Sequence, residues 1–186
     1  MSDNTQHART VTTVDRGTLD LRSLMLYAIL LAAGIVLNLT VSKLFASVTG
    51  GMLAPEFVIA AFCLEILIVR PTIPQSLVVG LIAGVIIQFS ASVKGPDLIA
   101  EPIAAAVMAA LVLALAKSSA LKVVPLVGTF VVTFVSGLIY ALVLAFGIQH
   151  DISILFVMLP VVAATGVVNG VIVQALFFPL RKVLNR

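Results

Sequence analysis

The sequence predicts an all-α integral membrane protein, a bundle of six transmembrane helices. Of its 186 residues, 61% are hydrophobic and only 10% are charged, whereas a soluble domain has about 25% charged residues. The apolar residues also gather in six separate runs, most of them near the roughly 20 residues that cross a bilayer as a helix. We therefore expect a multi-pass protein of the cell (plasma) membrane, in contact with the lipid bilayer.

The six runs follow one another along the chain with short polar connections. They are Leu24–Leu39, Pro55–Val69, Pro74–Phe89, Pro102–Ala116, Pro125–Phe146 and Pro160–Phe178. Proline begins five of the six, as expected at the first helical position, where its missing N–H costs nothing. Several runs are short, which predicts tilted helices or a locally thinned bilayer. The apolar stretch 152–159 is either an interfacial segment or the first part of the last helix, kinked at Pro160.

The beginning of the chain differs from the rest in composition. Residues 1–20 are polar, carry charges of both signs and lack the apolar core and cleavage site of a signal peptide. We expect a flexible cytoplasmic tail over residues 1–20, followed by one membrane domain over residues 21–186.

The basic residues predict the orientation. With six spans, nine of the eleven fall on the side of the two termini: Arg9, Arg16, Arg22, Arg70, Lys117, Lys122, Arg181, Lys182 and Arg186. Only Lys43 and Lys94 fall on the other side. Because Lys and Arg favour the cytoplasmic side, both termini are expected inside and the segment KGPDLIAEP (94–102) outside.

Several function classes find no support in the sequence. The basic residues form no stripe of the kind that binds nucleic acid, so no nucleic-acid partner is expected. The GxxxxGK[ST], HExxH and paired-cysteine motifs are absent. Ser136 could serve a membrane protease only with a histidine on a neighbouring helix, but His7 lies in the tail and His150 in an outer turn. We expect neither enzyme activity nor a cofactor.

The first apolar run carries a pair of small residues at helical spacing. Ala28 and Ala32 are four residues apart and share one helix face, where small side chains let another helix approach closely. The pair either packs inside the bundle or forms a docking face for another membrane subunit.

These features together resemble one family of transport proteins. Six spans in under 190 residues and the Ala28/Ala32 pair are similar to the substrate-binding S components of energy-coupling factor (ECF) transporters, closest to the tryptophan-transport (TrpP-like) family. The likeness rests on GGMLAPE (50–56), ILIVRP (66–71), LVVGLIAGVI (77–86) and GPDLIAEP (95–102). It implies capture of a vitamin or amino acid at the outer face. It also implies docking through Ala28 and Ala32 onto a transmembrane coupling subunit driven by two ATPase subunits.

The resemblance gives the outer charges a role in binding a small-molecule substrate, with tryptophan as the leading ligand. Its ammonium would lie against Asp97 and Glu101, and its carboxylate against Lys94 or the start of the helix at Pro102. Each charge also has a plain alternative, as an acid at a helix N-terminus or a solvated loop residue. Further candidates are Glu56, Gln88 and Asn169.

The ligand and the transport class stay open. Where the tryptophan family has an Asn and a basic residue in this loop, this chain has Asp97 and Glu101. The alternatives are an S component for a vitamin or other aromatic metabolite, and a small stand-alone secondary transporter.

Overall fold

The computed structural model describes residues 20–115 and 122–184, and the regular elements in these ranges are helices, without a strand. In chain order they are α1 (Leu21–Leu37), η1 (Asn38–Ser42), α2 (Lys43–Val48), α3 (Phe57–Val69), α4 (Ile73–Ile87), α5 (Asp97–Leu115), α6 (Val124–Leu142), η3 (Val143–Ile148) and α7 (Ser153–Val183). Residues 1–19 of the predicted tail (1–20) lie outside the described residues, as do Lys117 and Arg186, which are predicted to be cytoplasmic. The all-α class is confirmed for the described part.

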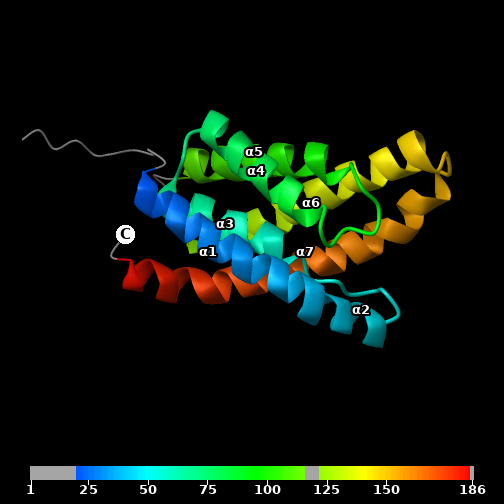
Figure 1. The fold of residues 1–186 in the computed structure, drawn as a ribbon, viewed down its shortest axis with the longest axis horizontal. Helices are drawn as coiled ribbons and strands as arrows, with labels where there is room; N and C mark the ends of the chain where they lie inside the picture. The colour runs from blue at the N-terminus through cyan, green and yellow to red at the C-terminus, as the bar shows by residue number, and fades with distance from the viewer. Residues whose placement is uncertain (1–19, 116–121, 185–186) are drawn as a thin grey trace, which may run out of the picture.

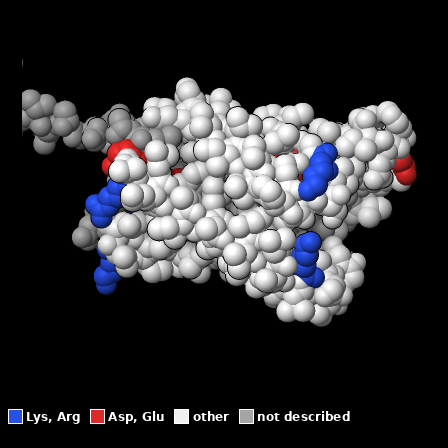
Figure 2. All heavy atoms as spheres, viewed as in Figure 1, with Lys and Arg blue, Asp and Glu red and all other residues white. Residues whose placement is uncertain are grey.

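The helices form one elongated bundle around α3. Helix α4 packs on α5, α6 packs on α7, and α3 contacts α1, α4, α5, α6 and α7. Helix α1 begins and α7 ends at the same end of the bundle (Figure 1). In the view of Figure 2, the charged side chains lie mainly towards the two ends, with a largely uncharged surface between them. This distribution is typical of a protein that spans a bilayer.

Four helical segments are long and apolar enough to cross a membrane: Leu21–Val48, Asp97–Leu115, Val124–Ile148 and Ser153–Val183. Helices α3 and α4 are apolar but have only 13 and 15 residues. At 1.5 Å per residue, α3 is about 20 Å long, less than the ~30 Å of a hydrocarbon core. The described residues therefore give four candidate spans and two shorter apolar helices, which leaves the predicted count of six spans a prediction.

The short α3 is enclosed by its neighbours. Its sequence, FVIAAFCLEILIV, is apolar nearly all the way round, as expected of a helix with no solvent face, and every residue from Val58 to Val69 is buried. The helix ends at Arg70, which adopts a left-handed conformation with φ of 56°, and Pro71 follows, a residue that cannot continue the hydrogen-bonding of a helix.

Two helix boundaries differ from those expected, and the structure decides between the two alternatives for a third. The first helical segment continues through η1 and α2 as far as Val48, so Lys43 lies in a helix rather than in a loop. Helix α5 begins at Asp97, five residues before Pro102, which places Glu101 inside the helix. Helix α7 runs through Pro160, so residues 153–159 are the first part of the last helix rather than a separate interfacial segment.

Two glycines of α4 bring that helix against the first turns of α5. A Cβ at Gly84 would lie 2.7 Å from the carbonyl oxygen of Asp97, and one at Gly80 would lie 2.7 Å from Cα of Pro102. Larger residues at these positions would push the helices apart, so the Gly80/Gly84 pair fixes where the start of α5 lies.

The alanine pair of α1 does not pack inside the bundle. Ala28 and Ala32 are both exposed, whereas Gly34 is the small residue of α1 that meets α3, because a Cβ there would lie 3.0 Å from the carbonyl oxygen of Phe57. Of the two interpretations of the pair, internal packing is therefore wrong. The exposed pair is open to lipid or to another subunit.

Candidate functional site

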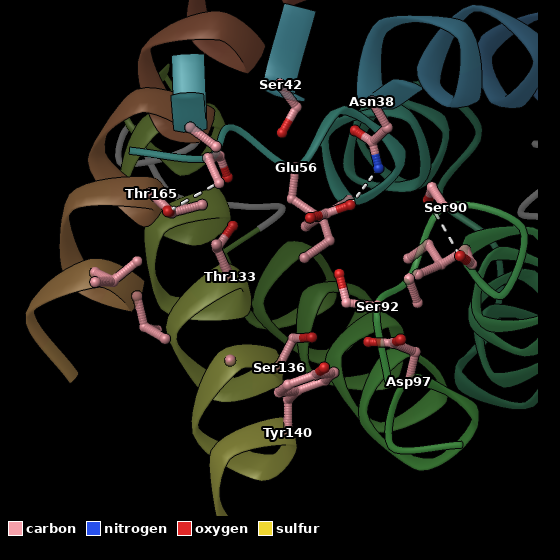
Figure 3. Close-up of a pocket in the computed structure, with 18 of the residues that line it drawn as sticks. Asn38, Ser42, Glu56, Ser90, Ser92, Asp97, Thr133, Ser136, Tyr140 and Thr165 are labelled. Atoms are coloured by element: carbon pink, nitrogen blue, oxygen red, sulfur yellow. Dashed lines mark hydrogen bonds between the residues drawn. The ribbon is translucent and has the colours of Figure 1, made fainter. Parts of the chain in front are cut away.

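A cavity of about 310 Å³ lies where α1 passes into η1 and where α5 begins. This is at the low end of the range of about 300–1,000 Å³ found for small-molecule sites. Polar side chains from several elements converge on it, as Figure 3 shows. They are Asn38, Ser42, Lys43, Glu56, Ser90, Ser92, Asp97, Glu101, Thr133, Ser136, Tyr140 and Thr165.

The π-helical turn η1 contributes to this convergence. It interrupts the first helical segment at Asn38–Ser42, and both end residues of the turn are buried and line the cavity. An inserted π-turn rotates the side chains that follow it relative to a regular α-helix, and such turns are frequent at functional sites.

Glu56 lies in the connection before α3 and is held by two buried asparagines. The Asn38 side chain donates to Oε1 of Glu56 and accepts from the backbone N–H of Phe57 at 2.7 Å. Oδ1 of Asn169 accepts from the backbone N–H of Glu56 at 3.0 Å, and its Nδ2 donates to the Glu56 carbonyl and to Oγ1 of Thr133, each at 3.3 Å. The backbone of the connection is thereby fixed between α1 and α7.

Asp97 and Glu101 form the opposite wall. They are four residues apart in α5 and so lie on one helix face, and only 7% and 1% of their surfaces are exposed. Ser136 of α6 donates to Oε1 of Glu101 at 2.7 Å. Oδ2 of Asp97 and Oε2 of Glu101 have no hydrogen-bond partner among the described residues. A buried acceptor left in this state costs about 1–3 kcal/mol, and more when it is charged.

The remaining walls are largely apolar. Ile59 of α3, Ile87 of α4 and Met158, Val161 and Val162 of α7 contribute to them. Tyr140 of α6 adds a half-buried ring, which Figure 3 places beside Ser136 and near Asp97. The cavity therefore combines the Asp97 and Glu101 pair, and Glu56 across from it, with largely apolar surface elsewhere, which suits a molecule with one cationic end and an apolar body.

Three of the six predicted binding residues line the cavity, namely Glu56, Asp97 and Glu101. Asn169 lies behind the lining and bonds to Glu56. The other two predicted residues bond to the chain that leads into α5. Gln88 donates to the Gly84 carbonyl and accepts from the Gly95 N–H, both at 2.9 Å, and the Lys94 ammonium donates to the Gln88 carbonyl. Substrate contact by any of the six stays a prediction.

Sequence reasoning missed the contribution of α6. Thr133, Ser136 and Tyr140 all line the cavity, and with Thr129 they recur every three or four residues along an otherwise apolar helix. This polar stripe at helical spacing was readable as one face of the helix and is the signal that would have found them.

The acidic side chains of the cavity were also compared with the pattern of a metal site. Within residues 20–115 and 122–184, no group of three or more His, Cys, Asp or Glu side chains is placed to hold a metal ion. The carboxylate oxygens of the lining can accept hydrogen bonds, and its hydroxyl groups can donate or accept them.

Comparison with known proteins returned no similarity. No family model matches the chain, and no curated protein sequence or solved structure matches it.

Proposed function

We propose that the chain is the substrate-binding S component of an ECF-type importer, which captures a small ammonium-bearing metabolite in the cavity at the α5 wall. The observation that carries the proposal is the cavity itself, in which the buried carboxylates of Asp97 and Glu101 face apolar walls at the end of a membrane bundle. Ionisable groups at such depth mark substrate or ion pathways by default.

The orientation supports capture from outside. Among the described basic residues, Arg22 lies in the first turn of α1, and Arg181 and Lys182 lie in the last turn of α7, at the end opposite the cavity. The excess of Lys and Arg at that end favours a cytoplasmic location for both termini. The cavity then opens towards the outer face.

The exposed alanines of α1 supply the docking surface for the coupling subunit. Ala28 and Ala32 offer a flat patch on which a second helix can lie closely. The two ATPase subunits that power import would act through that coupling subunit.

Tryptophan is the first ligand to test, because its ammonium matches the carboxylates and its indole ring matches the apolar walls. A vitamin or another aromatic metabolite is the alternative within the same class. A stand-alone secondary transporter is favoured by one observation, the deep burial of Glu101 at 1% exposure, since buried carboxylates also occur along proton pathways.

The docking assignment is tested by uptake. Cells that contain the chain, the coupling subunit and the ATPases are compared for import of labelled ligand. The double variant Ala28→Leu with Ala32→Leu is expected to bind ligand normally and to lose ATP-dependent uptake, because leucine side chains keep a second helix at a distance.

The chain offers a matched control for this test. Ala110 and Ala114 of α5 are also four residues apart and exposed, so Ala110→Leu with Ala114→Leu adds the same bulk to a different helix. Normal uptake by the α1 variant would overturn the docking assignment. Uptake by the chain alone in liposomes, driven by an ion gradient, would overturn the S-component proposal in favour of a secondary transporter.

A further inference from the structure

The acidic wall of the cavity presents oxygen atoms that nothing in the described chain uses. Asp97 and Glu101 are more than nine-tenths buried and line the cavity, and one oxygen of each lacks a hydrogen-bond partner among the described residues. Because a buried acceptor is costly when it is unpaired, these two oxygens are placed for donors that come from a ligand.

The basic side chains at this end of the bundle do not supply those donors. The Lys94 ammonium donates to the backbone carbonyl of Gln88. Lys43 is the basic residue of the described lining, and it is exposed at the start of α2. The ionisable side chains that share the cavity with Asp97 and Glu101 are otherwise Glu56 and Tyr140, which supply no positive charge.

The donors of the lining that could serve a ligand's carboxylate are the ammonium of the exposed Lys43 and the hydroxyl groups. At the start of α5, the N–H groups of Leu98, Ile99 and Ala100 donate to the carbonyls of Gly95 and Pro96 at 3.0–3.1 Å. At the start of α3, the N–H groups of Glu56 and Phe57 donate to the asparagine side chains at 3.0 and 2.7 Å. These five N–H groups, which lie where a helix start would attract an anion, are therefore already bonded within the chain.

A zwitterionic amino acid fits this arrangement at only one end. Its ammonium gains two carboxylates, but its own carboxylate is held within one small cavity beside three acidic side chains and a single basic one, the exposed Lys43. Repulsion between like charges therefore outweighs attraction at that end. An amine without an acid group gains the same attraction and avoids the repulsion.

We propose that the substrate is an organic amine of net positive charge without an acid group, whose ammonium binds between Asp97 and Glu101 and whose apolar body lies against the α3, α4 and α7 walls. The inference rests on the proposed function, because it names the substrate class of the same cavity. The three donors of a primary ammonium match the two open oxygens and leave one for a hydroxyl such as that of Tyr140.

Three indole compounds test the contributions of the ligand's ammonium and carboxylate separately. Tryptamine has the ammonium alone, tryptophan has both charges, and indole-3-propionate has the carboxylate alone. The purified full chain is titrated with each, and the ligand's own fluorescence is read, because the protein contains no Trp. We expect tryptamine to bind at least about tenfold more tightly than tryptophan, and indole-3-propionate to bind most weakly.

Isosteric variants test whether Asp97 and Glu101 bind the ligand's ammonium. Glu101→Gln and Asp97→Asn are each expected to weaken tryptamine binding by about tenfold or more. Asp151→Asn is the matched control and is expected to bind as the wild type. Hydrogen bonds from Ser153 hold the pKa of Asp151 below its usual value, and its side chain is fully exposed, so it carries charge outside the cavity. Size-exclusion and thermal unfolding profiles establish that each variant is folded.

Three outcomes would overturn the proposal. They are binding of tryptophan or indole-3-propionate as tight as that of tryptamine, wild-type affinity in both acid variants, or calorimetry that detects no binding of tryptamine, tyramine or cadaverine. The titration needs neither ATP nor partner subunits. Its result therefore tests the substrate class independently of the proposal that the chain belongs to an importer. Amine binding without ATP-dependent uptake would overturn the importer alone, and uptake that prefers the zwitterion would overturn the substrate class alone.

Discussion

The two carboxylate-bearing walls of the cavity are built in opposite ways. At Glu56, two buried asparagines bond the side chain and both backbone groups of the residue. At Asp97 and Glu101, the backbone is fixed by helix α5, but one oxygen of each side chain is left open. In the first wall the chain bonds the backbone and one carboxylate oxygen of Glu56, whereas in the second wall each carboxylate has a buried oxygen without a described partner. On the proposed function, we therefore expect Glu56 mainly to hold the fold and the α5 pair mainly to bind the ligand.

The largest expected effect is on the position of the α5 wall. Gly80→Ala places a Cβ 2.7 Å from Cα of Pro102 and 2.8 Å from Cβ of Ala105. We expect it to lower the free energy of unfolding by about 3 kcal/mol, because α4 and α5 must separate, and to reduce ligand affinity. Thermal unfolding in detergent measures the first effect. Gly147→Ala is the control, since its Cβ meets only Val143 Cγ1 at 3.8 Å, and equal stability of the two variants would refute the packing argument.

The next effect concerns the Glu56 wall. Asn169→Leu removes the bonds to Thr133 and to both backbone groups of Glu56, and it leaves buried polar groups unpaired. We expect a loss of about 2 kcal/mol in the free energy of unfolding. Gln174→Leu on the same helix removes a single bond, to the Lys122 carbonyl at 3.3 Å, and is expected to cost clearly less. A stable Asn169→Leu variant would mean that the connection before α3 does not depend on this residue.

A smaller effect is expected at the hydroxyl that joins α6 to the α5 wall. Ser136→Ala deletes the 2.7 Å bond to Glu101 and is expected to lower the free energy of unfolding by about 1 kcal/mol. Ser47→Ala removes an exposed bond to the Leu44 carbonyl and is expected to change stability by less than about 0.5 kcal/mol. The two unfolding temperatures, measured side by side, decide whether the Ser136 bond contributes to the fold.

The smallest effect on stability is expected for Glu101→Gln, and this variant tests most directly whether the two walls have different roles. Glu101→Gln keeps an oxygen for Ser136 and removes a buried charge whose second oxygen has no described partner. We expect the free energy of unfolding of the ligand-free protein to stay within about 0.5 kcal/mol of the wild type or to rise, although ligand affinity falls. A marked loss of stability would show that Glu101 is as structural as Glu56 and would remove the distinction between the walls.

Composition and apolar runs were sufficient to predict the helical class and the approximate place of each helix. They did not fix where α5 begins. Pro102 resembles a first helical residue. However, Gly95 adopts a non-helical φ of 113°, and helix α5 begins two residues later, at Asp97. The acidic residues were recognised as a cluster because charge is conspicuous in so apolar a sequence. Their division into a bonded wall and an open wall was not predictable, because it depends on contacts between residues as distant as Glu56 and Asn169.

The number of membrane spans is a second feature that the sequence alone did not fix. A run of apolar residues predicts burial but does not say whether lipid or protein surrounds it. The run that became α3 is covered by five other helices. Its apolar composition is that of a membrane helix, although its length is not.

This enclosure has a consequence for how the protein is made. With 13 residues, α3 is too short to hold a stable transmembrane position by itself, and the turn at residues 70–72 joins it directly to α4. During synthesis, α3 is therefore expected to leave the translocon together with α4 as a helical hairpin, and to reach its final depth only when α1, α5 and α7 close around it. The centre of the mature bundle would then be among the last parts to be fixed in the membrane, although it lies early in the chain.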